Sequence, residues 1–365
     1  MLHLRDIAFA PLSLAYGAVG GARRALYRAG VLPVERVAAP VVSVGNITAG
    51  GTGKTPLVEW LARAASREGR RVCILTRGYG RAGADKRVLV SDGAQILAGA
   101  HEGGDEPRLL AENLRGQTVA IISDANRVAA ARWAIEHLQS DTFILDDGFQ
   151  HLRIARDLNI LTLDASDPWG SNQLLPRGRL REPLSELKRA DLIVITRAEL
   201  AGDLEALRSR AERLSGGRPV LIARTMTLRI KLLAAPHTDP HNDLHSEAGE
   251  RAHEIESIPQ PLAAFCAIGN AQAFFAHARG EGLELKHARS FADHHVYTQN
   301  DIDACVREAV RLGARALLTT AKDAVKLRAL DFALPCYVLE VVLKFDEEAR
   351  MQGILREALS RRRWL

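Results

Sequence analysis

A glycine-rich segment near the start of the chain has the residue types that bind phosphate groups. Residues 45–55 read Gly-Asn-Ile-Thr-Ala-Gly-Gly-Thr-Gly-Lys-Thr, between an apolar run that predicts a strand and an amphipathic run that predicts a helix. Loop amides and the helix N-terminus can surround phosphate oxygens, Lys54 can reach the β- and γ-phosphates, and the Thr55 hydroxyl can bind Mg²⁺. We therefore predict a nucleoside triphosphate site formed by Thr48, Ala49, Gly50, Gly51, Thr52, Gly53, Lys54 and Thr55.

Two positions distinguish this loop from related ones. Thr48 stands where the Walker A pattern has its first glycine, although the remaining GGTGKT is intact. Ala49 stands where the partition-type ATPases have a second lysine, which argues against that class.

Two adjacent aspartates follow the apolar run 142–145 and suit a Walker B strand. Such a strand ends beside the phosphate loop and presents a carboxylate to Mg²⁺ or its waters. Because neighbouring side chains of a strand point to opposite faces, we expect different roles for Asp146 and Asp147. A helix cap or turn is the structural alternative for this pair.

Three other charged segments have weaker signals. Gly103-Gly104-Asp105-Glu106-Pro107 is by itself typical of a helix N-terminus. The cluster Asp293, His294 and His295 could transfer protons, but such clusters are more often surface structure. Thr320-Ala-Lys-Asp323 has charges at a strand end and is interpreted as structural.

The segment Thr196-Arg-Ala-Glu199 bears on the choice of base. It follows an apolar run where GTPases have Asn/Thr-Lys-x-Asp, but its charged residues differ in length from that pattern. The sequence therefore favours ATP over GTP.

Alternating apolar and amphipathic runs position these residues. Continuous Val/Ile/Leu runs are typical of strands buried on both faces, which predicts an α/β fold with a mostly parallel, P-loop NTPase-type sheet between helices and a second, smaller α/β/α lobe. For the 365 residues we expect four parts: an N-terminal helix region (1–40), a P-loop domain (41–228), a linker (229–259) and the second lobe (260–365), whose last helix could return to the first lobe.

The N-terminal region has an apolar stripe with a basic flank. Apolar residues recur at helical spacing, and Arg23, Arg24 and Arg28 follow them. The stripe consists of Leu4, Ile7, Ala8, Leu12, Ala15 and Val19. The pattern suits a helix lying in a membrane interface, and it equally suits a helix packed on the domain core. The uncharged stretch 7–22 is too short to span a bilayer.

Composition limits the remaining classes. The chain is 47% hydrophobic and 25% charged, which fits a globular protein rather than a disordered or polytopic one. Its 4 cysteines are far apart in the sequence, which fits a reducing compartment without a disulfide framework or a structural zinc site. The net charge of +5 suits an anionic partner such as a phosphorylated substrate or a membrane surface. Nucleic acid is not expected, because the basic residues are scattered without interleaved aromatics, and no obligate protein partner is evident.

Seven motifs, in order along the chain, resemble the tetraacyldisaccharide 4′-kinase family, the lipid A 4′-kinases of Gram-negative bacteria. They are GNxTxGGTGKTP (45–56), TRGYGR (76–81), GDEP (104–107), DDGFQH (146–151), LPRGRLREP (175–183), DHHxY (293–297) and TxKD (320–323). The resemblance covers about residues 1–325, with Ala292 departing from an expected proline.

This resemblance implies an activity and a location. The family uses ATP and Mg²⁺ to phosphorylate the 4′-hydroxyl of a tetraacylated glucosamine disaccharide 1-phosphate, which gives lipid IVA. It works as a peripheral protein at the cytoplasmic face of the bacterial inner membrane, where its N-terminal helix contacts the bilayer. Its two lobes are joined by paired strands, for which the runs near 219–233 and 336–344 are candidates.

The resemblance also implies roles for individual residues. Asp105 matches the catalytic base, Asp147 and His294 its assistants, and Lys54 the phosphate contact. The metal contacts would be Thr55, Glu106 and Asp146. The lipid head-group cleft would include Arg77, Tyr79, Arg127, Gln150, His151, Arg177 and Arg179.

A rival interpretation is a P-loop transferase or ligase that acts on a small soluble acceptor. The apolar and basic N-terminal helix argues against it. A regulatory nucleotide-binding switch is a second, less favoured possibility.

Overall fold

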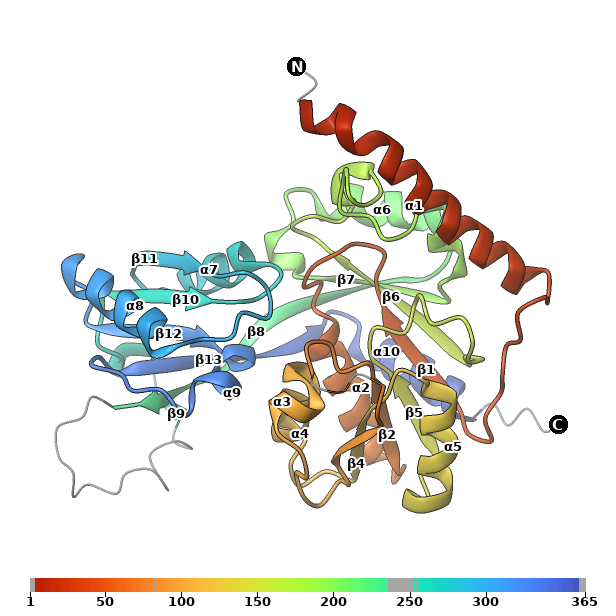
Figure 1. Cartoon of the computed structure of the whole chain (residues 1–365), viewed down its shortest axis with the longest axis horizontal. Coiled ribbons are helices and arrows are strands. Elements are labelled where there is room, and N and C mark those ends of the chain that lie inside the picture. Colours follow the sequence, from red (N-terminus) through yellow and green to blue (C-terminus); the bar gives the residue numbers. More distant parts are fainter. Residues whose placement is uncertain (1–3, 82, 84, 236–251, 254, 361–365) are drawn as a thin grey trace. The chain divides into compact units, whose positions relative to one another are not determined.

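The chain forms two compact units in a computed structural model that describes residues 4–81, 83, 85–235, 252–253 and 255–360. Unit 1 comprises Met1–Arg224 and Leu343–Leu365, and unit 2 comprises Thr225–Val342 (Figure 1). The central part of the predicted linker, 236–251, lies outside the described residues.

Unit 1 is built on a sheet in the order β8-β7-β6-β1-β5-β2-β4-β3. These strands are β1 (Val41–Gly45), β2 (Val72–Thr76), β3 (Val88–Ser91), β4 (Val119–Ser123), β5 (Thr142–Leu145), β6 (Leu158–Asp164), β7 (Leu192–Thr196) and β8 (Val220–Ala234). Neighbouring strands pair in parallel except β3, which is antiparallel to β4. Every residue of β1, β2 and β4–β7 is buried, as the continuous apolar runs predict, so the α/β fold is confirmed.

Helices cover both faces of this sheet. The helices of unit 1 are α1 (Leu4–Arg28), α2 (Lys54–Arg67), α3 (Ala100–Gly103), α4 (Asp105–Asn113), α5 (Arg127–Leu138), α6 (Leu204–Ser215) and α10 (Glu348–Ser360), with short 3-10 turns η1 (Gly170–Asn172), η2 (Leu184–Arg189) and η3 (Ala198–Leu200). Leu57 and Leu61 of α2 share a core with Met351 and Leu355 of α10, whereas α5 packs in a second core and α6 in a third. The last helix therefore belongs to unit 1.

Unit 2 contains a smaller parallel sheet in the order β11-β10-β12-β13. Its elements are β9 (Ala252–His253), η5 (Ile255–Ser257), β10 (Leu262–Cys266), α7 (Ala271–Gly280), β11 (Leu285–Ser290), α8 (Gln299–Arg311), β12 (Ala316–Thr320), α9 (Ala321–Leu327) and β13 (Cys336–Phe345). The chain passes between the units in two strands, since β8 begins in unit 1 and β13 ends there.

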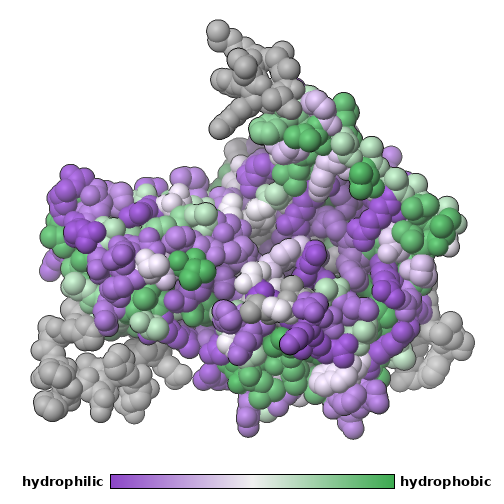
Figure 2. Space-filling model, viewed as in Figure 1, coloured by the Kyte–Doolittle hydropathy of each residue, from purple (hydrophilic) through white to green (hydrophobic). Residues whose placement is uncertain are grey.

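Helix α1 turns a polar side toward the rest of unit 1 and its apolar residues outward. Ser13 is buried, and its hydroxyl donates to the Leu174 carbonyl (3.1 Å). Leu12, Leu14 and Val19 are 56%, 75% and 71% exposed, and Figure 2 shows apolar side chains along this helix at the upper right. The described part of the predicted stripe therefore does not pack on the core. No helix among the described residues has the length and apolarity that crossing a membrane requires.

Candidate active site

The phosphate loop connects β1 to α2, as the sequence predicts. Gly45 ends β1 and Lys54 begins α2. Gly53 precedes the helix with φ +74°, a left-handed conformation that strains residues with a side chain, and a Cβ there would also lie 3.2 Å from the Thr196 side chain. Glycine at this position therefore allows the turn into α2. The first backbone amides of the helix can then bind phosphate oxygens.

Three side chains from neighbouring strands and segments hold the loop carbonyls. Thr196 Oγ1 donates to the Thr52 carbonyl (2.9 Å), and Arg197 Nη1 donates to the Gly51 carbonyl (2.7 Å). Arg179 Nη2 donates to the Ala49 carbonyl (2.9 Å). The segment 196–199, which the sequence places where GTPases read the base, therefore contributes Thr196 and Arg197 to the support of the loop.

Lys54 points back across the loop to two acceptors. Its Nζ lies 3.2 Å from Asn46 Oδ1 and 3.5 Å from Asp147 Oδ1. Both contacts hold the ammonium group over the loop, where phosphate oxygens would meet it.

Asp147 is shared between two cations. Its carboxylate accepts from Arg181 Nη1 at 3.0 and 2.8 Å and also faces Lys54. Burial by itself would raise the pKa of Asp147, but Lys54 and Arg181 hold it below the ordinary value. Asp147 is therefore ionised in the folded protein.

The Walker B strand is shorter than the sequence suggests. β5 ends at Leu145, and Asp146 and Asp147 both lie in the turn that follows, with Asp147 at φ +52°. The expected alternation of strand side chains is therefore not what separates them. Their surroundings separate them instead, because Asp147 has cationic partners, whereas neither oxygen of Asp146 is hydrogen-bonded within the described part of the chain.

Asp146 has the properties of a cation ligand. It is 1% exposed, and neither carboxylate oxygen has a hydrogen-bond partner among the described residues. Burial, with the negative charges of Glu106 and Asp147, raises its pKa to about 7. A buried carboxylate without a donor is stabilised by a bound cation, so this position fits Mg²⁺. The described residues contain no group of three or more metal-binding side chains, and Mg²⁺ commonly completes its shell with water and nucleotide phosphates.

Replacing Asp146 by asparagine should stabilise the nucleotide-free, metal-free protein. The pKa of Asp146 is higher in the folded chain (about 7) than its ordinary value of 3.8, so the folded state binds more protons and the free energy of unfolding falls as pH rises between these values. The asparagine side chain has no charge to bury. We expect a gain of about 1–2 kcal/mol at pH 8 and a smaller gain at pH 5, measured by denaturant unfolding with a chelator present.

Asp92→Asn is the matched control for this measurement. Backbone amides of Gln95 and Ala94 lower the pKa of Asp92, so its charged form is stabilised by folding and asparagine should not increase stability there. If Asp146→Asn were no more stable than the wild type at pH 8, the conclusion that the buried Asp146 charge destabilises the metal-free protein would be wrong.

The acidic turn begins helix α4. Gly104 has φ +102°, and a Cβ there would lie 3.0 Å from Gly78 Cα, so glycine allows the turn to contact the 76–81 segment. Ser123 Oγ at the end of β4 donates to the Gly103 carbonyl (2.6 Å). Asp105 and Glu106 are then half-buried in the first turn of α4, and the Glu106 charge acts on Asp146.

Four of the predicted head-group residues lie in segments that follow the carboxyl ends of β2, β4 and β5, namely Arg77, Tyr79, Arg127 and His151. Arg77 donates to the Tyr79 hydroxyl (3.3 Å) and lies over its ring (5.2 Å). Arg127 is 5% exposed, and burial and then Arg77 lower its pKa, while Asp146 and Asp147 oppose that shift. Burial, followed by nearby arginines led by Arg127, lowers the pKa of His151 to about 4, so this imidazole is neutral.

The other three predicted head-group residues contact protein groups. Gln150 Nε2 donates to the Asn46 carbonyl (2.8 Å), and the Arg177 amide donates to Ser13 Oγ (3.0 Å). Arg179 bonds the phosphate loop and pairs with Asp167 (2.7 Å). Their assignment to the substrate stays a prediction, and their observed contacts are with the loop, with α1 and with Asp167.

His294 lies in a turn of unit 2 that two charged neighbours hold. It has φ +62°, its Nε2 is 3.9 Å from Asp293 Oδ1, and Lys322 Nζ donates to that same oxygen (3.3 Å). The Thr-x-Lys-Asp motif thus fixes the turn that carries His294. The role of His294 beside Asp105 stays a prediction.

Two residues that contact Lys54 and Asp147 were missed by the sequence prediction. Asn46 is the acceptor for Lys54, and Arg181 is the partner of Asp147. A signal was available for Arg181, because it stands in the LPRGRLREP motif (175–183) that carries part of the family resemblance. Asn46 likewise stands in the GNxTxGGTGKTP motif (45–56), although its side chain was given no role.

Comparison with known proteins supports one family. Residues 5–360 match the LpxK family, described as tetraacyldisaccharide-1-P 4′-kinase. A tetraacyldisaccharide 4′-kinase of Anaeromyxobacter dehalogenans is 41% identical over 98% of this chain and 91% of its own length. A tetraacyldisaccharide 4′-kinase of Chlorobium phaeovibrioides is 35% identical over 99% of this chain and 100% of its own length. The crystal structure of LpxK from Aquifex aeolicus in complex with ATP is similar with a TM-score of 0.73 at 29% identity, covering 97% of this chain and 99% of that one.

Proposed function

This chain belongs to the tetraacyldisaccharide-1-P 4′-kinase family, and from that membership we propose that it transfers the γ-phosphate of ATP to the 4′-hydroxyl of a tetraacylated glucosamine disaccharide 1-phosphate. The product would be lipid IVA, an intermediate of lipid A. The observation that carries the proposal is the phosphate loop with Lys54 3.5 Å from Asp147, next to the buried carboxylate of Asp146, which has no hydrogen-bond partner among the described residues.

The chain's own residues would supply charge and position rather than covalent chemistry. The loop amides and Lys54 would bind the phosphates, and Asp147 and Asn46 would hold the Lys54 ammonium in place. Asp105, half-buried at the start of α4, would accept the proton of the sugar hydroxyl. His294 is proposed to assist it.

A magnesium ion would be held by Asp146, Glu106 and Thr55. It would neutralise charge on the transferring phosphates. The support is the buried carboxylate of Asp146, which has no hydrogen-bond donor among the described residues, and the negative charge of Glu106, which together with burial raises the pKa of Asp146.

We propose a peripheral location at the cytoplasmic face of the inner membrane. The substrate's acyl chains leave a bilayer at a cost of about 0.8 kcal/mol per CH₂, so the enzyme has to reach its substrate there. Leu12, Leu14 and Val19 of α1 are exposed, and Arg23 and Arg28 follow on the same helix. Apolar and basic residues together suit an anionic lipid surface, and this argues against a small soluble acceptor.

One assay tests the activity and the membrane contact. Vesicles that contain the tetraacylated disaccharide 1-phosphate are incubated with γ-labelled ATP, and we expect label in a chloroform-soluble glycolipid. The triple variant of Leu12, Leu14 and Val19 to serine should transfer at least about tenfold less label from vesicles, because less apolar area enters the bilayer.

Detergent micelles separate the two proposals. In micelles that present the same substrate, the triple variant should transfer label like the wild type, and Val310→Ser, an exposed valine of α8, is the matched control on vesicles. No labelled lipid with the wild type would refute the kinase assignment. Labelled lipid with equal vesicle activity of the triple variant would refute only the membrane role of α1.

A further inference from the structure

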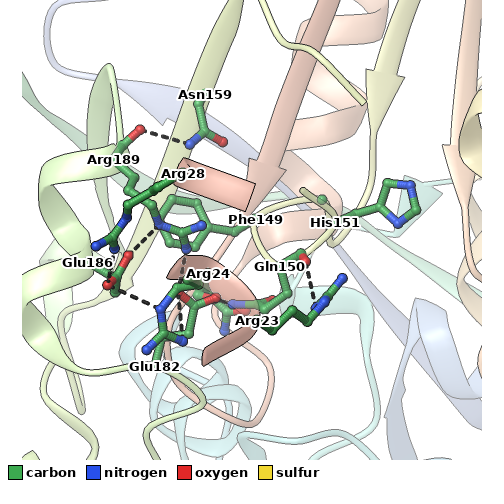
Figure 3. Close-up of polar contacts among 12 residues, drawn as sticks. Arg23, Arg24, Arg28, Phe149, Gln150, His151, Asn159, Glu182, Glu186 and Arg189 are labelled. Carbon is green, nitrogen blue, oxygen red and sulfur yellow. Dashed lines mark hydrogen bonds and ion pairs between the residues drawn. The ribbon is translucent and has the colours of Figure 1, made fainter. Parts of the chain in front are cut away.

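A cluster of charges around two buried glutamates fixes α1 to the rest of unit 1. We call it the α1 dock and define it by Arg24, Arg28, Glu182, Glu186 and Arg189 (Figure 3). Arg24 Nε lies 3.1 Å from Glu186 Oε1, and Arg189 Nε lies 2.8 Å from Glu186 Oε2. The Glu182 and Glu186 side chains are 5% and 8% exposed, so both depend on these arginines.

Glu182 ends a segment that is bonded to the phosphate loop. The Arg181 amide donates to the Ile47 carbonyl (2.6 Å), and the Ala49 amide donates to the Arg179 carbonyl (2.6 Å). Segment 179–182 is therefore bonded through its backbone to the loop at one end and belongs to the α1 dock at the other.

Arg181 lies between the dock and Lys54. Its guanidinium shares Asp147 with Lys54, at 2.8 Å and 3.5 Å respectively. If Arg181 moved away, Asp147 would pair with Lys54 alone and compete with nucleotide phosphates for its ammonium group.

A second path joins α1 to the same loop. Arg23 Nη1 donates to the Gln150 carbonyl (3.3 Å), and Gln150 Nε2 donates to the Asn46 carbonyl (2.8 Å). Next to Gln150, the Phe149 ring lies under the Arg189 guanidinium at 4.2 Å (Figure 3). Residues 46, 47 and 49 of the loop thus receive support that begins on α1.

We propose that α1 is a structural part of the nucleotide site, with Arg24 and Glu182 as positioning residues that hold segment 179–182 and so keep Lys54 available to ATP. The inference rests on the proposed phosphate-loop site and does not depend on the proposed membrane contact. Removing the dock weakens ATP binding even where no lipid is present.

The test is the Kd of ATP for the full chain without lipid, measured by calorimetry. Arg24→Gln and Glu182→Gln should each raise the Kd about tenfold, and Arg24→Lys, which keeps the charge, should restore most of the affinity. Arg36→Gln is the matched control, because it removes an ion pair of unit 1, Arg36 with Asp157 at 3.3 Å, that touches neither α1 nor the loop. Its Kd should equal that of the wild type.

A double-mutant cycle shows whether the effect passes through Arg181. Arg24→Gln and Arg181→Gln should together raise the Kd by less than the product of their separate effects, since both act on Asp147 and Lys54. Independent effects, or unchanged ATP affinity in folded Arg24→Gln, would overturn the proposal. If Glu182→Gln does not fold, the cycle of Arg24→Gln with Arg181→Gln decides the question, because it leaves Glu182 in place. If the lipid-kinase assay failed while these Kd values changed as expected, the proposed lipid substrate would be wrong and the inference about α1 would stand.

Discussion

Replacing Lys54 by alanine should lower kcat for phosphoryl transfer by about 10²–10³-fold. The Lys54 ammonium group is held over the phosphate loop by Asn46 and Asp147, at 3.2 and 3.5 Å, so it is already in place before charge moves to the transferring phosphate. An oriented charge of this kind stabilises a transition state more than a flexible one, because it does not reorganise during the reaction. Initial rates at saturating ATP and saturating glycolipid measure the effect.

Two variants make the Lys54 result specific. Lys344→Ala removes an exposed lysine of unit 1 and should leave kcat unchanged. Lys54→Arg keeps the charge but changes its shape, and we expect activity between the wild type and alanine. A Lys54→Ala enzyme with more than about a third of the wild-type kcat would be incompatible with a phosphate-binding Lys54.

Asp105→Asn should lower kcat by about 10²–10⁴-fold with little change in the KM for ATP. Asparagine has nearly the same size as aspartate but cannot accept a proton, so the turn that Gly104 and Ser123 hold should keep its geometry. A general base acts only after both substrates are bound, which is why kcat is the affected constant. Steady-state kinetics over a pH series measures both constants, and the acidic limb that belongs to the base should disappear.

A purely structural Asp105 would behave differently. It would alter the affinity for ATP or the stability of the protein, and it would keep the pH dependence of the wild type. Asp85→Asn, at an exposed position of unit 1, is the control for an unspecific loss of charge. If Asp105→Asn retained wild-type kcat, another group would have to accept the sugar proton.

The stability expected of Asp146→Asn connects these results to folding. The same buried carboxylate that fits a cation destabilises the protein when no cation is bound, because its charge has no hydrogen-bond donor among the described residues. A gain in stability with a loss of activity would therefore identify Asp146 as a site residue rather than a core residue.

The sequence alone was sufficient for the buried strands and for the phosphate loop, although it extended β5 into the turn that holds Asp146 and Asp147. Continuous apolar runs predicted the buried parallel strands, and the glycine-rich turn between strand and helix predicted the phosphate loop, because both features are contained in short stretches of chain. The motif order also identified the family, which residues 5–360 match.

Tertiary structure decided which distant residues meet. Arg181 pairs with Asp147, which is 34 positions away in the sequence, and Arg24 pairs with Glu186 of η2. These contacts depend on the strand order and on the path of segment 179–182, and no spacing in the sequence predicts them. The outward direction of the apolar residues of α1 was likewise left open by its periodicity, which is the same for a helix on a core and a helix on a membrane. It was decided by the buried glutamates of unit 1, which need arginine partners and therefore bind the polar side of the helix.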